Sequence, residues 1–367
     1  MTKKILIFHP TIAPYRIDLF NSLHKEFNIK VCLAYENLRD QKFNYDWIYN
    51  KFLFKPIYLS HLATIRNRYL CGGYWRHIKE FNPDIVIVSE FGLDAIATVC
   101  YKKLFRKKFE IISICDDSFD MLVSDDDFSK AHKYLRKILV PHLSNLILVQ
   151  PESRKWYLEN YNKGIFFPII ADDGRIRAEY KKALDKSNGL IDRYSLINKK
   201  VILFVGRLIG LKNVSFLINN YSDMNMNNCV LVIVGDGEEY VALKDSAKNN
   251  RNIIFTGRLE NENLFAWYNI ANIFVLPSLK EPFGAVTNEA LLGGCYALIS
   301  DKAGSACLIN GKNGKIFSPD DNNDFRMKLS DLLLESKPIE YLSQIRESKM
   351  PNTYEHYFAS LLEQLNL

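Results

Sequence analysis

Short apolar runs alternate with amphipathic stretches along most of the chain. The runs lie at 4–8, 29–33, 85–88, 111–114 and 146–149, and again at 201–205, 230–234, 253–256, 273–276 and 297–300. Each is rich in Val, Ile or Leu and is bounded by polar or turn residues, which is typical of buried strands. The stretches between them have helical spacing, as at Ile17, Phe20 and Leu23. This alternation predicts an α/β protein whose parallel sheets are covered by helices.

The runs form two series, and a charged region without strand signal separates them. A chain of 367 residues is too long for one ordinary core and suits two domains. We therefore expect a first Rossmann-like domain over residues 1–170, a linker over 171–199 and a second Rossmann-like domain over 200–345. An apolar stripe of helical period predicts a C-terminal helix within 346–367 that packs on the first domain.

The stretch from Ser278 to Phe317 holds the most informative chemistry. Glu281 stands in a loop before Pro-Phe-Gly, and Glu289 stands a little over one turn inside the short helical run that follows. The first amides of a helix lack partners inside the helix, so they favour a phosphate or diphosphate. Ribose and hexose hydroxyls suit the two carboxylates, so a sugar nucleotide fits this pattern. Two solvated glutamates are the alternative.

A second candidate is the loop that follows the run at 201–205. Arg207 and Lys212 stand in it five residues apart, just before the next predicted helix. In folds of this kind ligands collect beyond the carboxyl ends of the strands. The two cations fit a diphosphate there and would stabilise the charge of a departing nucleoside diphosphate. A solvated loop is the alternative.

Taken together, these residues resemble the signature of the retaining glycosyltransferases of family four. The pattern comprises Glu281 and Glu289 with Pro-Phe-Gly between them, then Asp301, Gly304, Ser305 and Asn313-Gly314, and upstream a Gly-Arg with a later Lys. The resemblance covers about residues 200–320. It implies a GT-B architecture of two Rossmann-like domains with a cleft between them, and a nucleotide sugar held mostly by the second domain.

The resemblance also implies roles for single residues. Glu281 would orient the transferred sugar, Glu289 would hold the ribose, and Arg207 with Lys212 would stabilise the leaving diphosphate. The other positions expected to frame the donor are Gly206, Gly235, Asp236, Arg258, Leu259, Phe283, Gly284, Ala285 and Val286. No residue here distinguishes uracil from guanine, and of the two we favour a UDP-sugar. The family needs no metal and no further cofactor.

The first domain should bind the acceptor, but its motifs are less specific. Many relatives have a glycine pair after the first strand, where this chain has Thr11–Arg16. Asp116 follows the run at 111–114, where some members place a histidine near the reacting sugar. We include Asp116 among the catalytic candidates, with a turn or helix cap as the alternative. The isolated histidines are expected to be structural; they are His9, His61, His132 and His142.

Charge and cysteines limit the partners and the setting. The formal net charge is +6, and residues 1–170 hold 25 Lys and Arg against 18 Asp and Glu. Two basic clusters with interleaved aromatic residues lie there, one around 66–79 and one at 102–108. They indicate either a solvated face or peripheral contact with an anionic membrane. Nucleic acid is not expected, because no nucleic-acid module is present.

The seven cysteines form no CxxC motif, which argues against a disulfide framework or a zinc site. No signal peptide precedes the first strand, and no apolar run reaches the length of a membrane span. We therefore expect a cytoplasmic protein, with the inner face of the cytoplasmic membrane as the further possibility.

The sequence thus predicts a metal-independent retaining glycosyltransferase. It would transfer a hexose from a nucleoside-diphosphate sugar to a saccharide or lipid-linked acceptor, in the biosynthesis of a bacterial surface polysaccharide such as a capsule or lipopolysaccharide. Two alternatives stay open, a non-catalytic GT-B subunit that supports a partner transferase and a nucleotide-sugar epimerase on the same fold. The presence of all four charged residues disfavours the first, and no epimerase signature is found.

Overall fold

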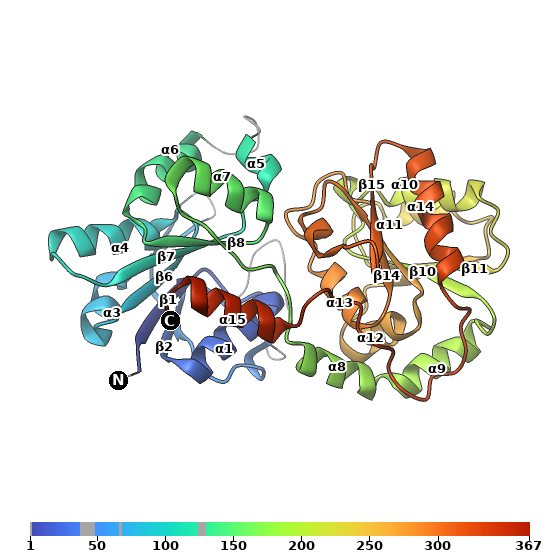
Figure 1. The fold of residues 1–367 in the computed structure, drawn as a ribbon, viewed down its shortest axis with the longest axis horizontal. Coiled ribbons are helices and arrows are strands. Elements are labelled where there is room, and N and C mark those ends of the chain that lie inside the picture. Colours follow the sequence, from blue (N-terminus) through green and yellow to red (C-terminus); the bar gives the residue numbers. More distant parts are fainter. Residues whose placement is uncertain (1, 37–47, 66–67, 124–129) are drawn as a thin grey trace. The chain divides into compact units, whose positions relative to one another are not determined.

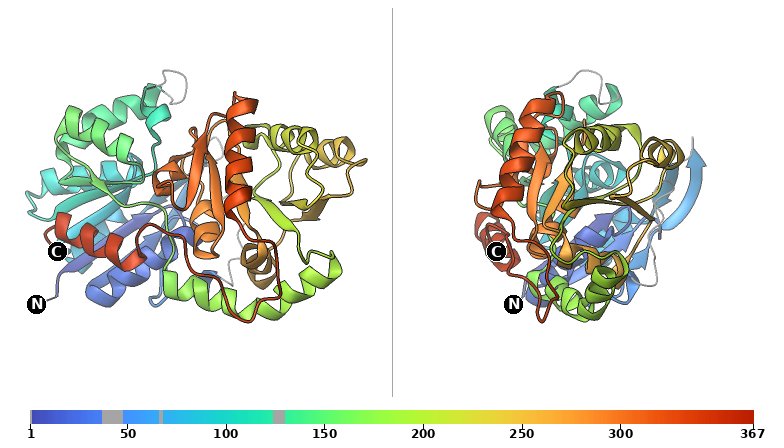
Figure 2. Two further views of the ribbon diagram at one scale, coloured as in Figure 1. Left: turned by 45° about the vertical axis from the view of Figure 1, so that its right-hand side comes forward. Right: turned by 90° about the vertical axis from the view of Figure 1, so that its right-hand side faces the viewer.

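The computed structural model describes residues 2–36, 48–65, 68–123 and 130–367. The chain folds into two compact units. One comprises Met1–Ile169 together with Tyr357–Leu367, and the other comprises Ile170–His356. In each unit helices cover a central sheet, as Figure 1 and Figure 2 show. Two Rossmann-like domains, the expected fold class, are confirmed.

The first unit is built on a seven-stranded sheet in the order β3-β2-β1-β6-β7-β8-β9. Its strands are β1 (Lys4–His9), β2 (Asn28–Leu33), β3 (Ile57–Tyr58), β6 (Ile85–Ser89), β7 (Glu110–Cys115), β8 (Asn145–Leu148) and β9 (Ile165–Phe166). All their pairings are parallel. A separate antiparallel pair is formed by β4 (Ser60–Ile65) and β5 (Arg68–Gly72). The carboxyl ends of the central strands therefore share one edge of the sheet.

The helices of the first unit follow the predicted amphipathic stretches. Among the described residues they are η1 (Pro14–Arg16), α1 (Ile17–Glu26), α3 (Tyr74–Phe81), α4 (Leu93–Leu104), α5 (Phe119–Val123), α6 (Lys130–Leu139), η2 (Val140–His142) and α7 (Pro151–Tyr161), and most of the C-terminal helix described below also belongs to this unit. In α1, for example, Ile17, Phe20 and Leu23 are all buried. These apolar faces pack on strands whose side chains are almost fully buried, which gives the unit its core.

The second unit has a six-stranded sheet in the order β12-β11-β10-β13-β14-β15. Its strands are β10 (Lys200–Val205), β11 (Cys229–Val234), β12 (Ile253–Gly257), β13 (Ile273–Leu276), β14 (Tyr296–Ser300) and β15 (Gly314–Phe317). Every pairing is parallel. Its helices are α8 (Asp173–Lys182), α9 (Leu184–Arg193), η3 (Gly210–Lys212), α10 (Val214–Asp223), α11 (Tyr240–Ser246), α12 (Asn261–Ile270), α13 (Val286–Leu292), η4 (Gly304–Leu308) and α14 (Asn322–Glu335).

The segment expected as a linker, residues 171–199, differs from the expectation. It forms α8 and α9, and both belong to the second unit. Asp172 caps α8 by accepting a hydrogen bond from the amide of Arg175 at 2.7 Å. Tyr180 is fully buried, so this charged helix has a narrow apolar face that packs into the second unit.

The C-terminal segment also differs in extent from the expected helix at 346–367. The helix α15 runs from Tyr354 to Gln364, and the residues before it lie along the second unit. There the guanidinium of Arg346 donates to the carbonyls of Tyr268 and Ala271 at 2.8 and 2.7 Å. From Tyr357 onwards the chain belongs to the first unit, where the ring of Tyr357 meets that of Phe166 edge-on.

Candidate functional site

Loops at the carboxyl edge of the second sheet are hydrogen-bonded to one another. The amide of Gly206, after β10, donates to the carbonyl of Val234 at 3.0 Å. The amide of Gly235, after β11, donates to the carbonyl of Gly257 at the end of β12, at 2.9 Å. These bonds hold three neighbouring loops at fixed spacing.

Gly235 is the position where this edge requires glycine. Its φ is +151°, and a Cβ there would lie 1.8 Å from the carbonyl oxygen of Gly206. Any side chain would therefore force the two loops apart. The carboxylate of the next residue, Asp236, accepts from the amide of Gly237 at 2.8 Å and so shapes the turn. Gly206 and Gly235 thus act as close-packing positions of the backbone.

The loop after β13 is tied to its neighbours on both sides. The amide of Leu279 donates to the carbonyl of Leu211 at 2.9 Å, which links this loop to the loop after β10. On the other side, the amide of Ser305 donates to the carbonyl of Phe283 at 2.7 Å. Glu281 forms an isolated bridge with Ala303. The backbone around Glu281 is therefore fixed by both adjacent loops.

The entry to α13 is tightly packed. Gly284 has a φ of +93°, and a Cβ there would lie 2.7 Å from the Cδ2 atom of Leu276. Phe283 is buried, whereas Ala285 and Val286 are half-buried. The predicted Pro-Phe-Gly entry thus combines one buried anchor, one strained glycine and two partly accessible positions at the start of the helix.

The closest contact between charged groups in this site joins Lys212 and Glu281. The Nζ atom of Lys212, at the end of η3, forms an ion pair with the Oε2 atom of Glu281. The two side chains are only 17% and 12% exposed. Burial, and then the nearby guanidinium of Arg207, lower the pKa of Lys212 from 10.5 to about 8. Arg207 itself is exposed directly after β10. Two loops therefore bring together the predicted cations Arg207 and Lys212 and the predicted carboxylate of Glu281.

Glu289 is held by two tyrosines that the sequence analysis did not single out. The hydroxyl of Tyr268, on α12, donates to its Oε2 atom at 3.0 Å, and the hydroxyl of Tyr180 donates to its backbone carbonyl at 2.6 Å. Burial raises the pKa of Glu289. Both tyrosines lie at helical spacing on apolar helix faces, which reads as core packing, so no sequence signal pointed to them.

Arg258 and Leu259, after β12, complete the predicted donor positions. The Nε atom of Arg258 donates to the Oε1 atom of Glu260 at 3.0 Å, and both side chains are exposed. Leu259 is half-buried. The structure therefore places Arg258 in an exposed ion pair at the same sheet edge.

In the first unit, Asp116 follows β7 and forms an ion pair with Arg16. Arg16 is 1% exposed, and Asp116 is 33% exposed. The carboxylate therefore faces solvent on one side and is held by a buried guanidinium on the other. The Thr11–Arg16 segment, which departs from the glycine pair of many relatives, supplies this cation.

Further ionisable groups lie around this pair. Glu90, after β6, adopts a φ of +51°, and its pKa is raised to about 7 by burial and then by Asp117 and Asp116. Burial lowers the pKa of His9 to about 4, and its Nδ1 atom lies 2.6 Å from the carbonyl of Thr11. His9 is therefore neutral near pH 7. These groups line the carboxyl edge of β1, β6 and β7.

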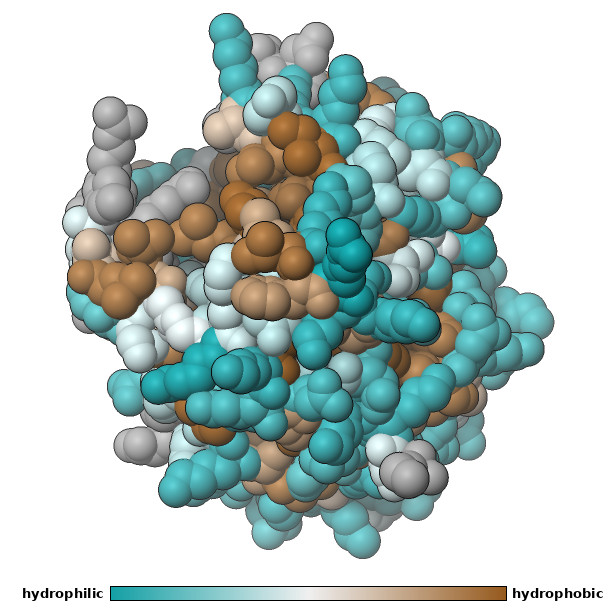
Figure 3. All heavy atoms as spheres, turned by 90° about the vertical axis from the view of Figure 1, so that its left-hand side faces the viewer, coloured by the Kyte–Doolittle hydropathy of each residue, from teal (hydrophilic) through white to brown (hydrophobic). Residues whose placement is uncertain are grey.

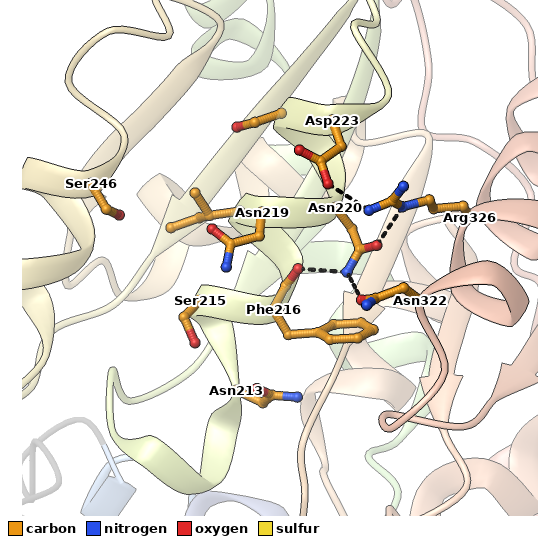
Figure 4. A pocket seen from close by; sticks show the side chains of 11 residues that line it. Asn213, Ser215, Phe216, Asn219, Asn220, Asp223, Ser246, Asn322 and Arg326 are labelled. Carbon is orange, nitrogen blue, oxygen red and sulfur yellow. Dashed lines mark hydrogen bonds and ion pairs between the residues drawn. The ribbon is translucent and has the colours of Figure 1, made fainter.

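A hollow of about 670 Å³ lies elsewhere on the second unit, beside α10 and α14 (Figure 4). Its polar side chains bind one another: Asn220 donates to Asn322 at 2.7 Å, and Arg326 donates to Asn220 and Asp223, both at 2.6 Å. This network joins the two helices, and none of the four predicted charged residues of the second unit lines the hollow.

Metal-binding clusters and membrane-spanning helices are both absent from the described residues. No group of three or more His, Cys, Asp or Glu residues among them has an arrangement that would hold a metal ion. In the same part of the chain, no helix combines the length and the apolar character needed to cross a membrane.

The family model of glycosyl transferases group 1 matches residues 192–349, which include Arg207, Lys212, Glu281 and Glu289. The resemblance to the group 1 glycosyltransferases is therefore confirmed over this segment of the chain. A GDP-mannose-dependent alpha-mannosyltransferase of Corynebacterium glutamicum is 24% identical over 309 residues, which cover 78% of this chain and 68% of that relative. Across the curated relatives compared with it, this chain spans between 27% and 70% of the relative's own length.

Solved structures of glycosyltransferases share the fold of this chain. An apo lipopolysaccharide outer core galactosyltransferase matches with a TM-score of 0.70 and 16% identity, over 99% of both chains. Anabaena HepE in complex with UDP-glucose matches with a TM-score of 0.67 and 15% identity, over 91% of this chain and 90% of that one. The expected GT-B fold class is therefore confirmed.

Proposed function

We propose that this protein is a retaining glycosyltransferase that moves a hexose from a nucleoside-diphosphate sugar to a saccharide or lipid-linked acceptor. The observation that carries the proposal is the partly buried Lys212–Glu281 pair beside Arg207, at the carboxyl edge of the second sheet. This edge is where ligands bind in open α/β sheets. The group 1 family match over the same residues supports the assignment.

Arg207 and Lys212 are assigned to the diphosphate of the donor. With a pKa of about 8, Lys212 is mostly protonated at pH 7, and a diphosphate beside it would favour the charged form further. Cations placed beside the diphosphate stabilise the negative charge that develops on it as it leaves. Because they are fixed by the loops before the donor arrives, little reorganisation accompanies the reaction.

The two glutamates are assigned to hydroxyl groups of the donor. A carboxylate has about four lone-pair positions, so Glu281 can bind Lys212 and still accept from the transferred sugar. Glu289 receives one hydrogen bond from Tyr268, which leaves its second oxygen for the ribose. In this arrangement the two carboxylates orient the donor, and neither of them acts as a base that takes the proton from the acceptor.

The donor is proposed to be a UDP-sugar. Anabaena HepE, which has the same fold, was solved with UDP-glucose, whereas the Corynebacterium relative is named for GDP-mannose. No side chain described above favours one base, so both nucleotides belong in the test. No metal is required in the proposed reaction, because Arg207 and Lys212 supply the positive charge.

The acceptor is assigned to the first unit. Asp116, one-third exposed and oriented by Arg16, offers a carboxylate to an acceptor hydroxyl. Relatives named for amylovoran biosynthesis and for a serotype-specific mannosyltransferase support a role in building bacterial surface polysaccharide. We place this reaction in the cytoplasm, at the inner face of the cytoplasmic membrane where the acceptor is lipid-linked.

The test is donor turnover by the purified protein with EDTA present. Release of nucleoside diphosphate is measured across UDP- and GDP-sugars with simple glycoside acceptors, and the anomeric configuration of any product is read by NMR. The proposal predicts an α-linked product from an α-donor, and activity reduced by at least a hundredfold in Glu281→Gln. Glu335→Gln, an exposed change on α14, serves as the matched control. A β-linked product or full activity of Glu281→Gln would refute it.

A further inference from the structure

The end of α4 carries large apolar side chains that are exposed to solvent. Leu104, the last residue of the helix, is 65% exposed, and the next residue, Phe105, is 49% exposed. Trp75, on the neighbouring α3, is 42% exposed and meets the ring of Phe105 edge-on with centroids 5.8 Å apart. Such side chains are usually covered by another apolar surface when they occur together.

Contacts with α4 hold these apolar side chains in place. The indole nitrogen of Trp75 donates to the carbonyl of Ala97 on α4 at 2.9 Å. The buried Tyr101 packs beneath them, with its ring 4.7 Å from that of Phe105 and 5.9 Å from that of Trp75. The patch is therefore a preformed surface of the folded unit, anchored to two helices.

Basic residues continue directly from this patch. Arg106, Lys107 and Lys108 are all exposed in the loop between α4 and β7. The helix end is closed by a bond from the amide of Lys107 to the carbonyl of Lys102 at 2.9 Å. Arg106 has a φ of +49°, which is typical of the residue that ends a helix. We call Trp75, Leu104, Phe105, Arg106, Lys107 and Lys108 the α4 tip.

Figure 3 views the molecule from the side on which α4 ends in Figure 1. Apolar side chains gather there in a continuous patch, and strongly hydrophilic side chains border it. The α4 tip contains residues 104–108 of the predicted basic cluster at 102–108, and Trp75 of the cluster around 66–79. Arg66 of the second cluster lies outside the described residues.

We propose that the α4 tip docks on the surface of an anionic lipid membrane. The three basic side chains of the α4 tip bind the lipid headgroups, while Leu104, Phe105 and Trp75 enter the boundary between headgroups and acyl chains. A nucleic acid would use the three cations but would leave the aliphatic Leu104 exposed. A membrane surface satisfies both kinds of side chain, and no spanning helix is needed for it.

The surface bears on the proposed function, because a lipid-linked acceptor lies at such a membrane. The evidence for the docking surface does not depend on the proposed function, because the exposure, the ring contacts and the charges of the α4 tip belong to the first unit alone. Two signals, one apolar and one electrostatic, are what reversible peripheral binding requires.

The expected effects follow from the general strength of each signal. Each basic residue near an anionic leaflet contributes about 1 kcal/mol, so Lys107→Gln with Lys108→Gln should weaken partitioning by about thirtyfold. Leu104→Ser removes an aliphatic side chain from the acyl boundary and should weaken it by about tenfold. Raising the salt from 0.1 to 0.5 M should release the wild type, because screening shortens the range of surface charges.

The experiment is co-sedimentation with vesicles of phosphatidylcholine containing 30% phosphatidylglycerol, against pure phosphatidylcholine. Two variants are matched controls: Lys25→Gln with Lys155→Gln changes the same charge elsewhere on the first unit, and Leu334→Ser changes an 83% exposed leucine of the second unit. We expect binding only to the anionic vesicles, with both α4 tip variants impaired and both controls bound as the wild type is.

Three results would overturn the proposal. The wild type would fail to sediment with anionic vesicles, or the control variants would lose as much binding as the α4 tip variants. In the third, Leu104→Ser would bind as well as the wild type, and a heparin column would retain the protein through the same lysines, which indicates a polyanion site. Vesicle binding without any release of nucleoside diphosphate would count against the proposed transferase activity and leave the docking surface intact.

Discussion

The Lys212–Glu281 pair gives the sharpest prediction about the stability of the second unit. Glu281→Gln keeps the shape of the side chain but leaves the ammonium of Lys212, only 17% exposed, without its counter-charge. Burial and Arg207 already lower the pKa of this ammonium from 10.5 to about 8 with the carboxylate in place, and removing one partner of a buried ion pair generally costs about 3 kcal/mol or more. We therefore expect Glu281→Gln to lower the free energy of unfolding by about 3 kcal/mol.

Removing the ammonium as well should restore much of this loss. The double variant Glu281→Gln/Lys212→Met buries no unpaired charge, so at pH 7 it should be more stable than Glu281→Gln by up to about 3 kcal/mol. The folded pKa of Lys212 lies below its unfolded value, so the unfolded state binds more protons between pH 8 and 10.5. The stability of Glu281→Gln must then rise with pH, and the gap between the two variants should close across that window.

Hydrogen exchange during urea unfolding, followed by mass spectrometry on peptides from β10 and β11, isolates the second unit from the first. The control is Asp331→Asn, which breaks the more exposed pair between Lys315 and Asp331, with side chains 28% and 44% exposed, and should cost less than about 1 kcal/mol. Equal losses in Glu281→Gln and Asp331→Asn would refute the reasoning. So would a double variant that is no more stable than Glu281→Gln at pH 7.

Two further substitutions test other parts of the structure. Gly235→Ala places a Cβ 1.8 Å from the carbonyl oxygen of Gly206 and should cost more than about 2 kcal/mol by calorimetry, whereas Gly257→Ala, with φ +72° and open space around it, should cost only about 1 kcal/mol. In the first unit, Glu90 keeps its proton up to about pH 7 when folded but only to 4.5 when unfolded, so its contribution to stability falls as pH rises through that window. Glu90→Gln should therefore match the wild type at pH 4.5 and exceed it by up to about 3 kcal/mol at pH 8; an equal difference at both pH values would contradict this.

The sequence predicted those parts of the molecule that depend on neighbouring residues. The apolar runs became the strands of two parallel sheets, and the loops holding Arg207 and Glu281 follow β10 and β13 as expected. The segment at 171–199 forms helices where a linker is expected, because α8 and α9 carry many charges around a narrow apolar face. Only tertiary packing shows that Tyr180 is buried.

The sequence could not show which residues pair with one another inside the two sites, and the reason is physical. Lys212 and Glu281 stand 69 positions apart, and Arg16 and Asp116 stand 100 apart, so each pair exists only after the strands between them have assembled. Tyr268 was hidden because an aromatic residue on a buried helix face is usually core, and its hydroxyl becomes informative only when it meets a carboxylate.

Every role assigned above depends on binding of the donor at the carboxyl edge of the second sheet, which calorimetric titration with UDP and GDP in the presence of EDTA measures. The wild type, Lys212→Met and Glu289→Gln are compared with Lys315→Met, which removes a half-buried lysine of the same unit. We expect one nucleotide to bind the wild type and Lys315→Met alike, and both site variants, still folded, to bind it at least tenfold more weakly. Failure of the wild type to bind either nucleotide, or unchanged affinity in both site variants, would contradict donor binding at this edge.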